Sequence, residues 1–293
     1  MLSFKKVTMD DKDIINQYLD INKFKNSEYN FTTIMAWQFV YETHYALVND
    51  CMILKGFEGK RAYFYFPLGK PENIKLALHS LMKHCEALDI PLSLINASDE
   101  MLDILVDIGM RDLFDLDCRR DAADYVYKRE KLVTLSGKKL HGKKNHLNFF
   151  NNNYESELVP IDDSNIEACE ELLKVEISER STRPFEELNS TFMALRYRDE
   201  FGLVGRALFA DGNLAGVILA ERHHEFVLIQ IAKANIAYRG ASVALFQKFL
   251  AENFTDYEYV NFMEDLGLEG LRRAKLSYDP EYLVDKCFLH LKH

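Results

Sequence analysis

The same order of hydrophobic patterns occurs twice along this 293-residue chain. Each occurrence reads strand, two helices, three strands, and then helix, strand, helix and strand. In the second occurrence the three consecutive strands are expected at 205–210, 214–221 and 225–233, with a hairpin turn at Asp211-Gly212-Asn213. A mixed central sheet flanked by helices satisfies this order in each half. The sequence therefore predicts an α/β (α+β) fold with two tandem domains of similar plan.

The composition is that of an ordinary globular protein. The chain is 48% hydrophobic and 28% charged, and its length suffices for two domains that each bury a core. Its net charge of −10 argues against a surface that binds nucleic acid over its whole extent. Any site for a polyanion must therefore be a local patch.

Cysteine usage and the N-terminus indicate a cytoplasmic protein. The five cysteines are scattered and none forms a Cys-x-x-Cys pair, which predicts free buried thiols in a reducing compartment. The N-terminal residues turn acidic too soon for a secretory signal, and no apolar run is long enough to span a bilayer. The histidine spacings favour no metal site. Any contact with lipid is expected from outside the bilayer.

Residues 128–144 depart sharply from the acidic background. They contain seven lysines and arginines and one acid, Glu130, so their local balance is 7 − 1 = +6. One interpretation is a phosphate-binding strip for tRNA or a lipid headgroup, and the alternative is a solvated linker. We expect an N-terminal domain at 1–130, a basic connecting segment at 131–150 and a C-terminal domain at 151–293.

A basic, glycine-containing turn joins the strand at 225–233 to a helix at 241–254. The turn includes Arg239, Gly240, Ala241 and Ser242. A helix start offers unpaired N–H groups and the positive end of a dipole, so it can hold a phosphate, and Gly240 would let the backbone approach a ligand. The alternative is a plain tight turn with Arg239 in solvent. The corresponding corner of the first half, at 69–71, has no such signal, which predicts one working and one degenerate half.

An acidic corner follows the strand expected at 257–263. Glu264 or Asp265 could take a proton from an amine nucleophile, or serve only as favourable charges before the next helix. Asn261 could orient a carbonyl group or simply end the strand.

The last helix and its exit supply further candidates. Arg272 and Lys275 are three residues apart, so they share a helix face that could hold a phosphate. Tyr278 could protonate a leaving group. The alternatives are an exposed cationic face and a packing tyrosine. Lys233, on a strand with apolar neighbours, either lines the cleft or reaches solvent at a sheet edge.

These residues resemble two groups of known proteins. The turn at 239–244 resembles the acyl-CoA pyrophosphate loop of GNAT acyltransferases, Gln/Arg-x-x-Gly-x-Gly/Ala, with Ser242 at the position of the middle glycine. Several segments are similar to an uncharacterised bacterial family related to the C-terminal domain of phosphatidylglycerol lysyltransferase. The resemblance covers essentially the whole chain and implies tandem GNAT-like domains, as in Fem-type enzymes that use aminoacyl-tRNA. Its segments are 124–127, 135–139, 143–145, 261–267, 270–272, Lys275 and 277–280.

We therefore expect an acyl- or aminoacyltransferase that acts on an amine or hydroxyl, such as a lipid headgroup. Aminoacyl-tRNA is the first choice of donor and acyl-CoA the second, and no further cofactor is firmly implied. The alternative is a non-catalytic GNAT-fold sensor of a nucleotide, tRNA or anionic headgroup. Catalysis is assigned to Glu264, Asp265 and Tyr278, and donor binding to Arg239, Gly240, Ala241 and Ser242. Phosphate or substrate binding is assigned to Lys138, Lys139, Lys143, Lys144, Asn145, Lys233, Asn261, Arg272 and Lys275.

Overall fold

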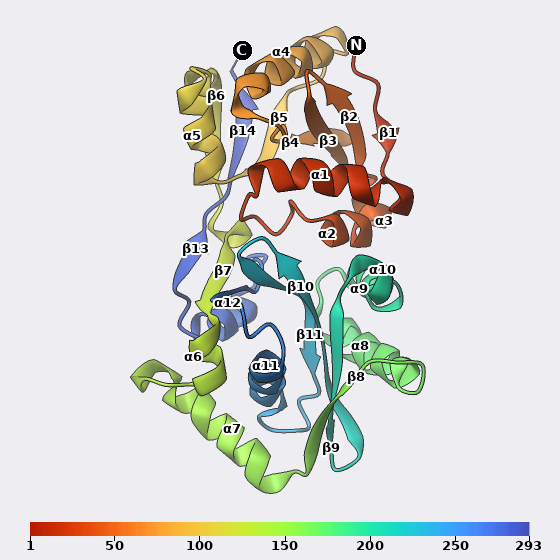
Figure 1. Cartoon of the computed structure of the whole chain (residues 1–293), viewed down its shortest axis with the longest axis vertical. Coiled ribbons are helices and arrows are strands. Elements are labelled where there is room, and N and C mark those ends of the chain that lie inside the picture. Colours follow the sequence, from red (N-terminus) through yellow and green to blue (C-terminus); the bar gives the residue numbers. More distant parts are fainter. Residues whose placement is uncertain (293) are drawn as a thin grey trace. The chain divides into compact units, whose positions relative to one another are not determined.

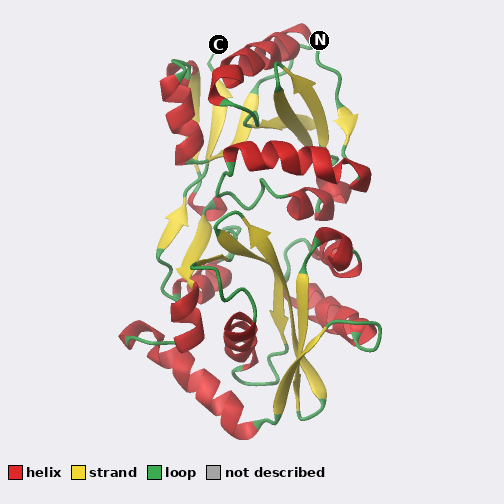
Figure 2. Cartoon of the chain, in the orientation of Figure 1, coloured by secondary structure: helices red, strands yellow, loops and turns green. Residues whose placement is uncertain are grey.

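The structure, a computed structural model, describes residues 1–292 and comprises two compact units (Figures 1 and 2). The first unit contains residues 1–123 and the residues from 284 onward. The second unit contains residues 124–283 and is therefore an insertion in the chain of the first. This division differs from the limits at 130 and 150 that the sequence predicted.

The first unit is built on a seven-stranded mixed sheet. β4 and β5 are parallel, and the other neighbouring strands are antiparallel. In their order across the sheet, the strands are β1 (Lys5–Lys6), β2 (His44–Val48), β3 (Cys51–Glu58), β4 (Arg61–Tyr65), β5 (Ser93–Ala97), β14 (Cys287–Leu291) and β6 (Phe114–Cys118).

The helices of this unit bury one apolar face each. In α4, Ile74, Ala77, Leu78 and Leu81 are fully buried, and their spacing of three and four residues places them on one side of the helix. The α-helices are α1 (Lys12–Asn22), α2 (Phe31–Ala36), α3 (Gln38–Tyr41), α4 (Pro71–Ala87) and α5 (Asp99–Asp107), with short 3₁₀ turns η1 (Met9–Asp11), η2 (Arg111–Leu113) and η3 (Arg120–Ala122).

A disulfide joins the two strands at one edge of the first sheet. Cys118 in β6 and Cys287 in β14 are directly opposite each other and are bonded through their sulfur atoms. The prediction that all five cysteines are free thiols is therefore wrong for this pair. Sequence spacing could not reveal it, because the two residues are 169 positions apart. Cys51, Cys85 and Cys169 are buried free thiols, as predicted.

The second unit also contains a seven-stranded mixed sheet. The strand at 124–128 precedes the domain limit expected at 130, but it lies in this sheet, where it pairs with β12. The last two strands of the chain, β13 and β14, are in different sheets, because β14 belongs to the sheet of the first unit. Across the sheet, the strands are β13 (Tyr282–Val284), β7 (Asp124–Lys128), β12 (Tyr259–Asn261), β11 (Phe226–Ala234), β10 (Asn213–His223), β9 (Val204–Ala210) and β8 (Ser156–Pro160).

Helices cover both faces of this sheet, with α11 on one side and α8 on the other (Figure 1). The predicted connecting segment at 131–150 is mostly helical and lies within the second unit, where Leu132, Leu140 and Phe150 are buried in its core. The helices are α6 (Arg129–Thr134), η4 (Lys138–Leu140), α7 (His141–Asn153), α8 (Ile166–Arg180), α9 (Pro184–Arg196), α10 (Arg198–Phe201), α11 (Ala241–Glu252) and α12 (Glu269–Leu276).

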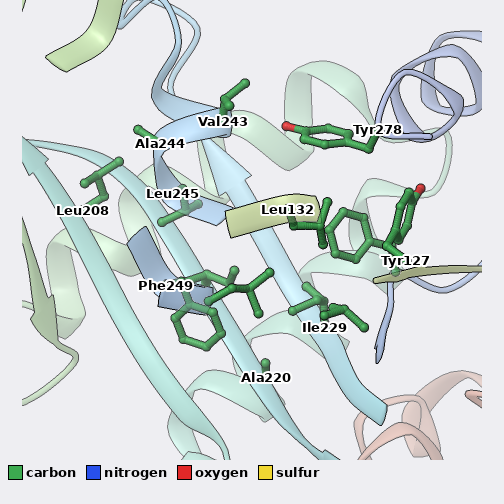
Figure 3. Packing of buried hydrophobic residues seen from close by; sticks show 14 of the residues in the cluster. Tyr127, Leu132, Leu208, Ala220, Ile229, Val243, Ala244, Leu245, Phe249 and Tyr278 are labelled. Atoms are coloured by element: carbon green, nitrogen blue, oxygen red, sulfur yellow. The ribbon is translucent and has the colours of Figure 1, made fainter. Parts of the chain in front are cut away.

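The core of the second unit gathers around α11 (Figure 3). Leu245 and Phe249 of this helix are buried against residues of β10 and β11, and each such side chain contributes about 1.5–3 kcal/mol by leaving water. β11 pairs in parallel with β12 over Phe226–Leu228 and then continues to Ala234, while β12 ends at Asn261. The pairing of the two strands ends at that point, and α11 begins seven residues after the end of β11.

No helix within residues 1–292 combines the length and the apolar composition needed to cross a bilayer.

Candidate functional site

The start of α11 is a tight turn centred on Gly240. Gly240 is the N-cap and has φ +92°, a left-handed conformation that glycine adopts without strain. The N–H of Ala241 donates to the Tyr238 carbonyl, and those of Val243 and Ala244 both donate to the Gly240 carbonyl. Most of the first-turn amides are therefore already used within the turn.

Helix α7 packs directly on this turn. A Cβ atom added to Gly240 would lie 2.3 Å from the His146 carbonyl oxygen and 3.1 Å from the Phe150 Cβ. The Arg239 guanidinium lies 4.4 Å from the centre of the Phe149 ring. The close approach that Gly240 was predicted to allow for a ligand is thus taken by α7, and Arg239 stacks on that helix.

Replacing Gly240 with alanine is expected to lower the free energy of unfolding by about 1–3 kcal/mol, because the new methyl group must displace helix backbone and φ is positive. Gly142→Ala in α7 is the matched control: no heavy atom lies within 4 Å of the added Cβ, so no loss of stability is expected. Urea unfolding of both variants tests this. Equal stabilities would contradict the packing described for Gly240.

Tyr278 lies beside the start of α11. Its side chain is 6% exposed, and its ring packs against Phe246 and Phe262. The hydroxyl points toward the first turn of α11 (Figure 3), where the Ser242 side chain is its hydrogen-bonding neighbour. Burial raises the pKa of Tyr278 to about 12, and the neighbouring Ser242 hydroxyl acts in the opposite direction.

Lys143 from α7 covers the Tyr278 ring. Its Nζ is 3.9 Å from the ring centre, and burial lowers the pKa of this lysine to about 8. Within the described residues it has no carboxylate partner. An amine, two hydroxyl groups and a helix start therefore come together at one place.

Three of the seven positive charges in residues 128–144 form ion pairs with two acids that the sequence analysis did not consider. Asp279 pairs with Lys139 at 2.8 Å and Lys131 at 3.6 Å, and Glu281 pairs with Lys131 at 2.9 Å and Lys128 at 3.8 Å. These acids flank Pro280, but only the fold brings them beside the basic segment.

Lys138 and Lys144 remain exposed on this segment. Neither forms an ion pair with any residue in the described part of the chain. Residues 138–153 contain no acid, so the exposed surface of η4 and α7 is cationic and rich in asparagine, including Asn145, which contacts His141 at 3.5 Å.

Asp265 is a buried structural anchor. Its side chain is fully inaccessible and accepts hydrogen bonds from Arg272 (2.8 and 2.9 Å), the Tyr125 hydroxyl (2.5 Å) and the Gly267 N–H (2.9 Å). Burial alone would raise the pKa of Asp265, but these hydrogen bonds lower it to about 2. Such a carboxylate is a poor proton acceptor, and Arg272 is occupied in holding it.

Lys275 and Asn261 are also used by the fold. The Lys275 ammonium donates to the backbone carbonyls of Phe262, Met263 and Glu264 at 2.6, 3.1 and 2.5 Å. Asn261 donates to Asp124 at 3.1 Å and accepts the Met263 N–H at 2.7 Å. These contacts fix the loop after β12 and favour the structural alternative for both residues.

Glu264 differs from its neighbours. Its backbone is held by Lys275, but its half-buried carboxylate makes no hydrogen bond or ion pair with residues 1–292. It is a carboxylate on a backbone that Lys275 holds, three residues after the end of β12, and it has no partner that would prevent proton transfer.

Lys233 lies elsewhere, paired with Glu187 of α9 at 2.7 Å. Among residues 1–292, no three His, Cys, Asp or Glu side chains form a group that could hold a metal ion. The site therefore gathers Ser242, Tyr278 and Lys143 at the start of α11.

Comparison with known proteins identifies the family. A family model described as phosphatidylglycerol lysyltransferase, C-terminal, matches residues 20–289. The chain belongs to this family. The match confirms the resemblance that the motifs indicated and agrees with a transferase.

Three solved structures resemble the family member described here. A conserved protein of unknown function from Bacteroides thetaiotaomicron VPI-5482 is 29% identical over 100% of both chains, with a TM-score of 0.91. L-PGS from Bacillus licheniformis is 13% identical over 96% of this chain and 92% of its own, with a TM-score of 0.67. A tandem GNAT protein from the clavulanic acid biosynthesis pathway is 10% identical over 99% and 98%, with a TM-score of 0.52. The tandem GNAT-like fold is thereby confirmed.

Proposed function

We propose that this chain is an aminoacyltransferase that takes an aminoacyl group from aminoacyl-tRNA. The observation that carries the proposal is the acid-free cationic surface of η4 and α7, where Lys138 and Lys144 have no carboxylate partner among residues 1–292, in a chain of net charge −10. Lysines without paired acids on one surface attract a phosphate backbone. The family's description supports a hydroxyl of an anionic lipid headgroup as the acceptor.

The geometry of the α11 turn favours aminoacyl-tRNA over acyl-CoA. A pyrophosphate needs several free N–H groups and an open approach, whereas the amides of Ala241, Val243 and Ala244 are bonded within the turn. Backbone atoms of α7 also lie against Gly240. The first feature removes hydrogen-bond donors that a CoA pyrophosphate would need, and the second reduces the space for it.

The transfer requires movement of one proton. The acceptor hydroxyl oxygen attacks the carbonyl carbon of the aminoacyl ester, the bond from that carbon to the ribose oxygen breaks, and a proton passes from the acceptor to the ribose oxygen. Glu264, whose carboxylate has no hydrogen bond or ion pair with residues 1–292, is our candidate to accept that proton. No covalent enzyme intermediate is needed, so positioning supplies much of the rate.

The test is binding of aminoacylated tRNA over a range of salt concentrations, with acetyl-CoA in parallel. Saturable binding that weakens steeply with salt is expected. The Lys138→Gln/Lys144→Gln variant should lower the slope of log affinity against log salt by about 2. The control, Lys60→Gln/Lys83→Gln, removes two exposed lysines of the first unit and should leave the slope unchanged. Acetyl-CoA binding without tRNA binding would overturn the choice of donor.

A further inference from the structure

The loop between β12 and α12 carries a leucine from which the fold gains little. Leu266 is 60% exposed and has φ +55°, a left-handed conformation that is costly for leucine but suits glycine or asparagine. The loop is firmly held, because the buried Asp265 carboxylate accepts the Gly267 N–H and the Lys275 ammonium donates to the Glu264 carbonyl. The structure therefore presents the Leu266 side chain to solvent on a fixed backbone.

The helix that follows continues this exposed surface. Within Glu269–Leu276, the whole of α12, no residue is buried. Gly270, Arg273 and Leu276 follow one another at intervals of three residues on its exposed side, and Leu276 is 48% exposed. Single exposed leucines are common, but one at each end of a helix without a buried residue makes an apolar surface. The α12 face is defined as Leu266, Gly270, Arg273, Ala274 and Leu276.

The α12 face is also positively charged. The exposed Arg273 side chain forms no hydrogen bond or ion pair with residues 1–292, and Glu269 is the only acid among residues 266–278. The basic segment adjoins the end of α12, where Lys139 pairs with Asp279. An RNA backbone would pair with these cations but leave the leucines in water. An anionic bilayer surface satisfies both, because it offers apolar chains beneath negative headgroups.

Glu264 gives this surface a place in the proposed reaction. It lies two residues before Leu266, so their Cα atoms are at most about 7 Å apart. A bilayer that contacts Leu266 therefore brings its headgroup hydroxyls near the candidate proton acceptor.

We propose that the α12 face docks on the surface of a bilayer that contains anionic phospholipid. Leu266 and Leu276 enter the outer part of the acyl chains, and Arg273 contacts the headgroup phosphates. The inference rests on the proposed function, in which a lipid headgroup is the acceptor. The contact needs no donor, so it is measured without tRNA.

The experiment is sedimentation of the full chain with phosphatidylcholine vesicles that contain or lack phosphatidylglycerol. Binding that requires phosphatidylglycerol and weakens with salt is expected. Leu266→Asn should weaken it about tenfold by removing one inserted leucine. Asparagine accepts a positive φ, so the variant should keep the stability of the wild type. The control, Leu76→Asn, changes a leucine of α4 that is 55% exposed and should bind like the wild type.

A second pair of variants tests the charge of the face. Arg273→Gln should weaken binding to phosphatidylglycerol vesicles about fivefold, the usual contribution of one basic residue at an anionic surface. Lys60→Gln removes an exposed lysine of the first unit and should leave the binding unchanged.

Three results would overturn the inference. They are wild-type vesicle binding in Leu266→Asn/Leu276→Asn, a vesicle-independent dimer that Leu266→Asn dissociates, and weaker tRNA binding by Leu266→Asn with vesicle binding unchanged. In the wild type, vesicle binding without tRNA binding would count against the proposed donor alone. Binding of tRNA without vesicle binding would count against the docking surface alone.

Discussion

Changing Glu264 to glutamine is expected to lower the rate of aminoacyl transfer by about 10²–10⁴, the usual contribution of a positioned general base. The substitution keeps the size and shape of the side chain, and the carboxylate has no protein partner within residues 1–292 to lose. The melting temperature should therefore stay within about 1 °C of wild type. Single-turnover transfer from aminoacyl-tRNA is the measurement.

Two outcomes of that measurement would be decisive. Full activity in Glu264→Gln would remove this residue from the mechanism. A wild-type protein that binds tRNA stoichiometrically but makes no product with any amine or hydroxyl acceptor would instead favour the non-catalytic sensor.

Replacing the adjacent Asp265 with alanine is expected to lower the stability of the protein, unlike the change at Glu264, which is expected to lower only the rate. It should destabilise the second unit by about 3–5 kcal/mol, because Arg272 and the Tyr125 hydroxyl lose their buried acceptor. Chemical denaturation followed by circular dichroism tests this. A stable, folded Asp265→Ala protein without activity would mean that Asp265 acts in the chemistry and that its contacts contribute little to the fold.

The pH dependence of stability is a second test of whether the Asp265 carboxylate stabilises the fold. Its pKa is about 2 in the folded protein and near 3.9 in an unfolded chain, so the ionised form stabilises the fold above about pH 4. That contribution is lost as pH falls toward 2. Asp265→Asn should therefore show a shallower loss of stability between pH 4 and pH 2 than the wild type.

The fold could be predicted from the sequence to a large extent, because its evidence is local. Alternating strands, the Asp211-Gly212 turn and the amphipathic face of α4 each depend on residues a few positions apart. The assignment of strands to sheets was less accurate. β7 and β14 each belong to the sheet of the other half, and each pairs with strands that are far away in the sequence.

Several of the candidate site residues have partners that the sequence could not show, for the same reason. A charged residue near a cleft has the same appearance in sequence whether it is free or paired. Arg272 is seven residues from Asp265, and Lys139 is 140 residues from Asp279. Glu264 and Asp265 are neighbours in sequence, and only their environments separate a free carboxylate from an anchored one.

The disulfide between Cys118 and Cys287 has a topological consequence. The backbone from residue 119 to residue 286 and the sulfur bridge form one closed covalent ring that contains the whole second unit. A single break in the backbone anywhere along that ring, including one in the loops around α7 or α12, leaves the two pieces covalently linked. After a single break of this kind, the two pieces separate only when a reductant also opens the disulfide.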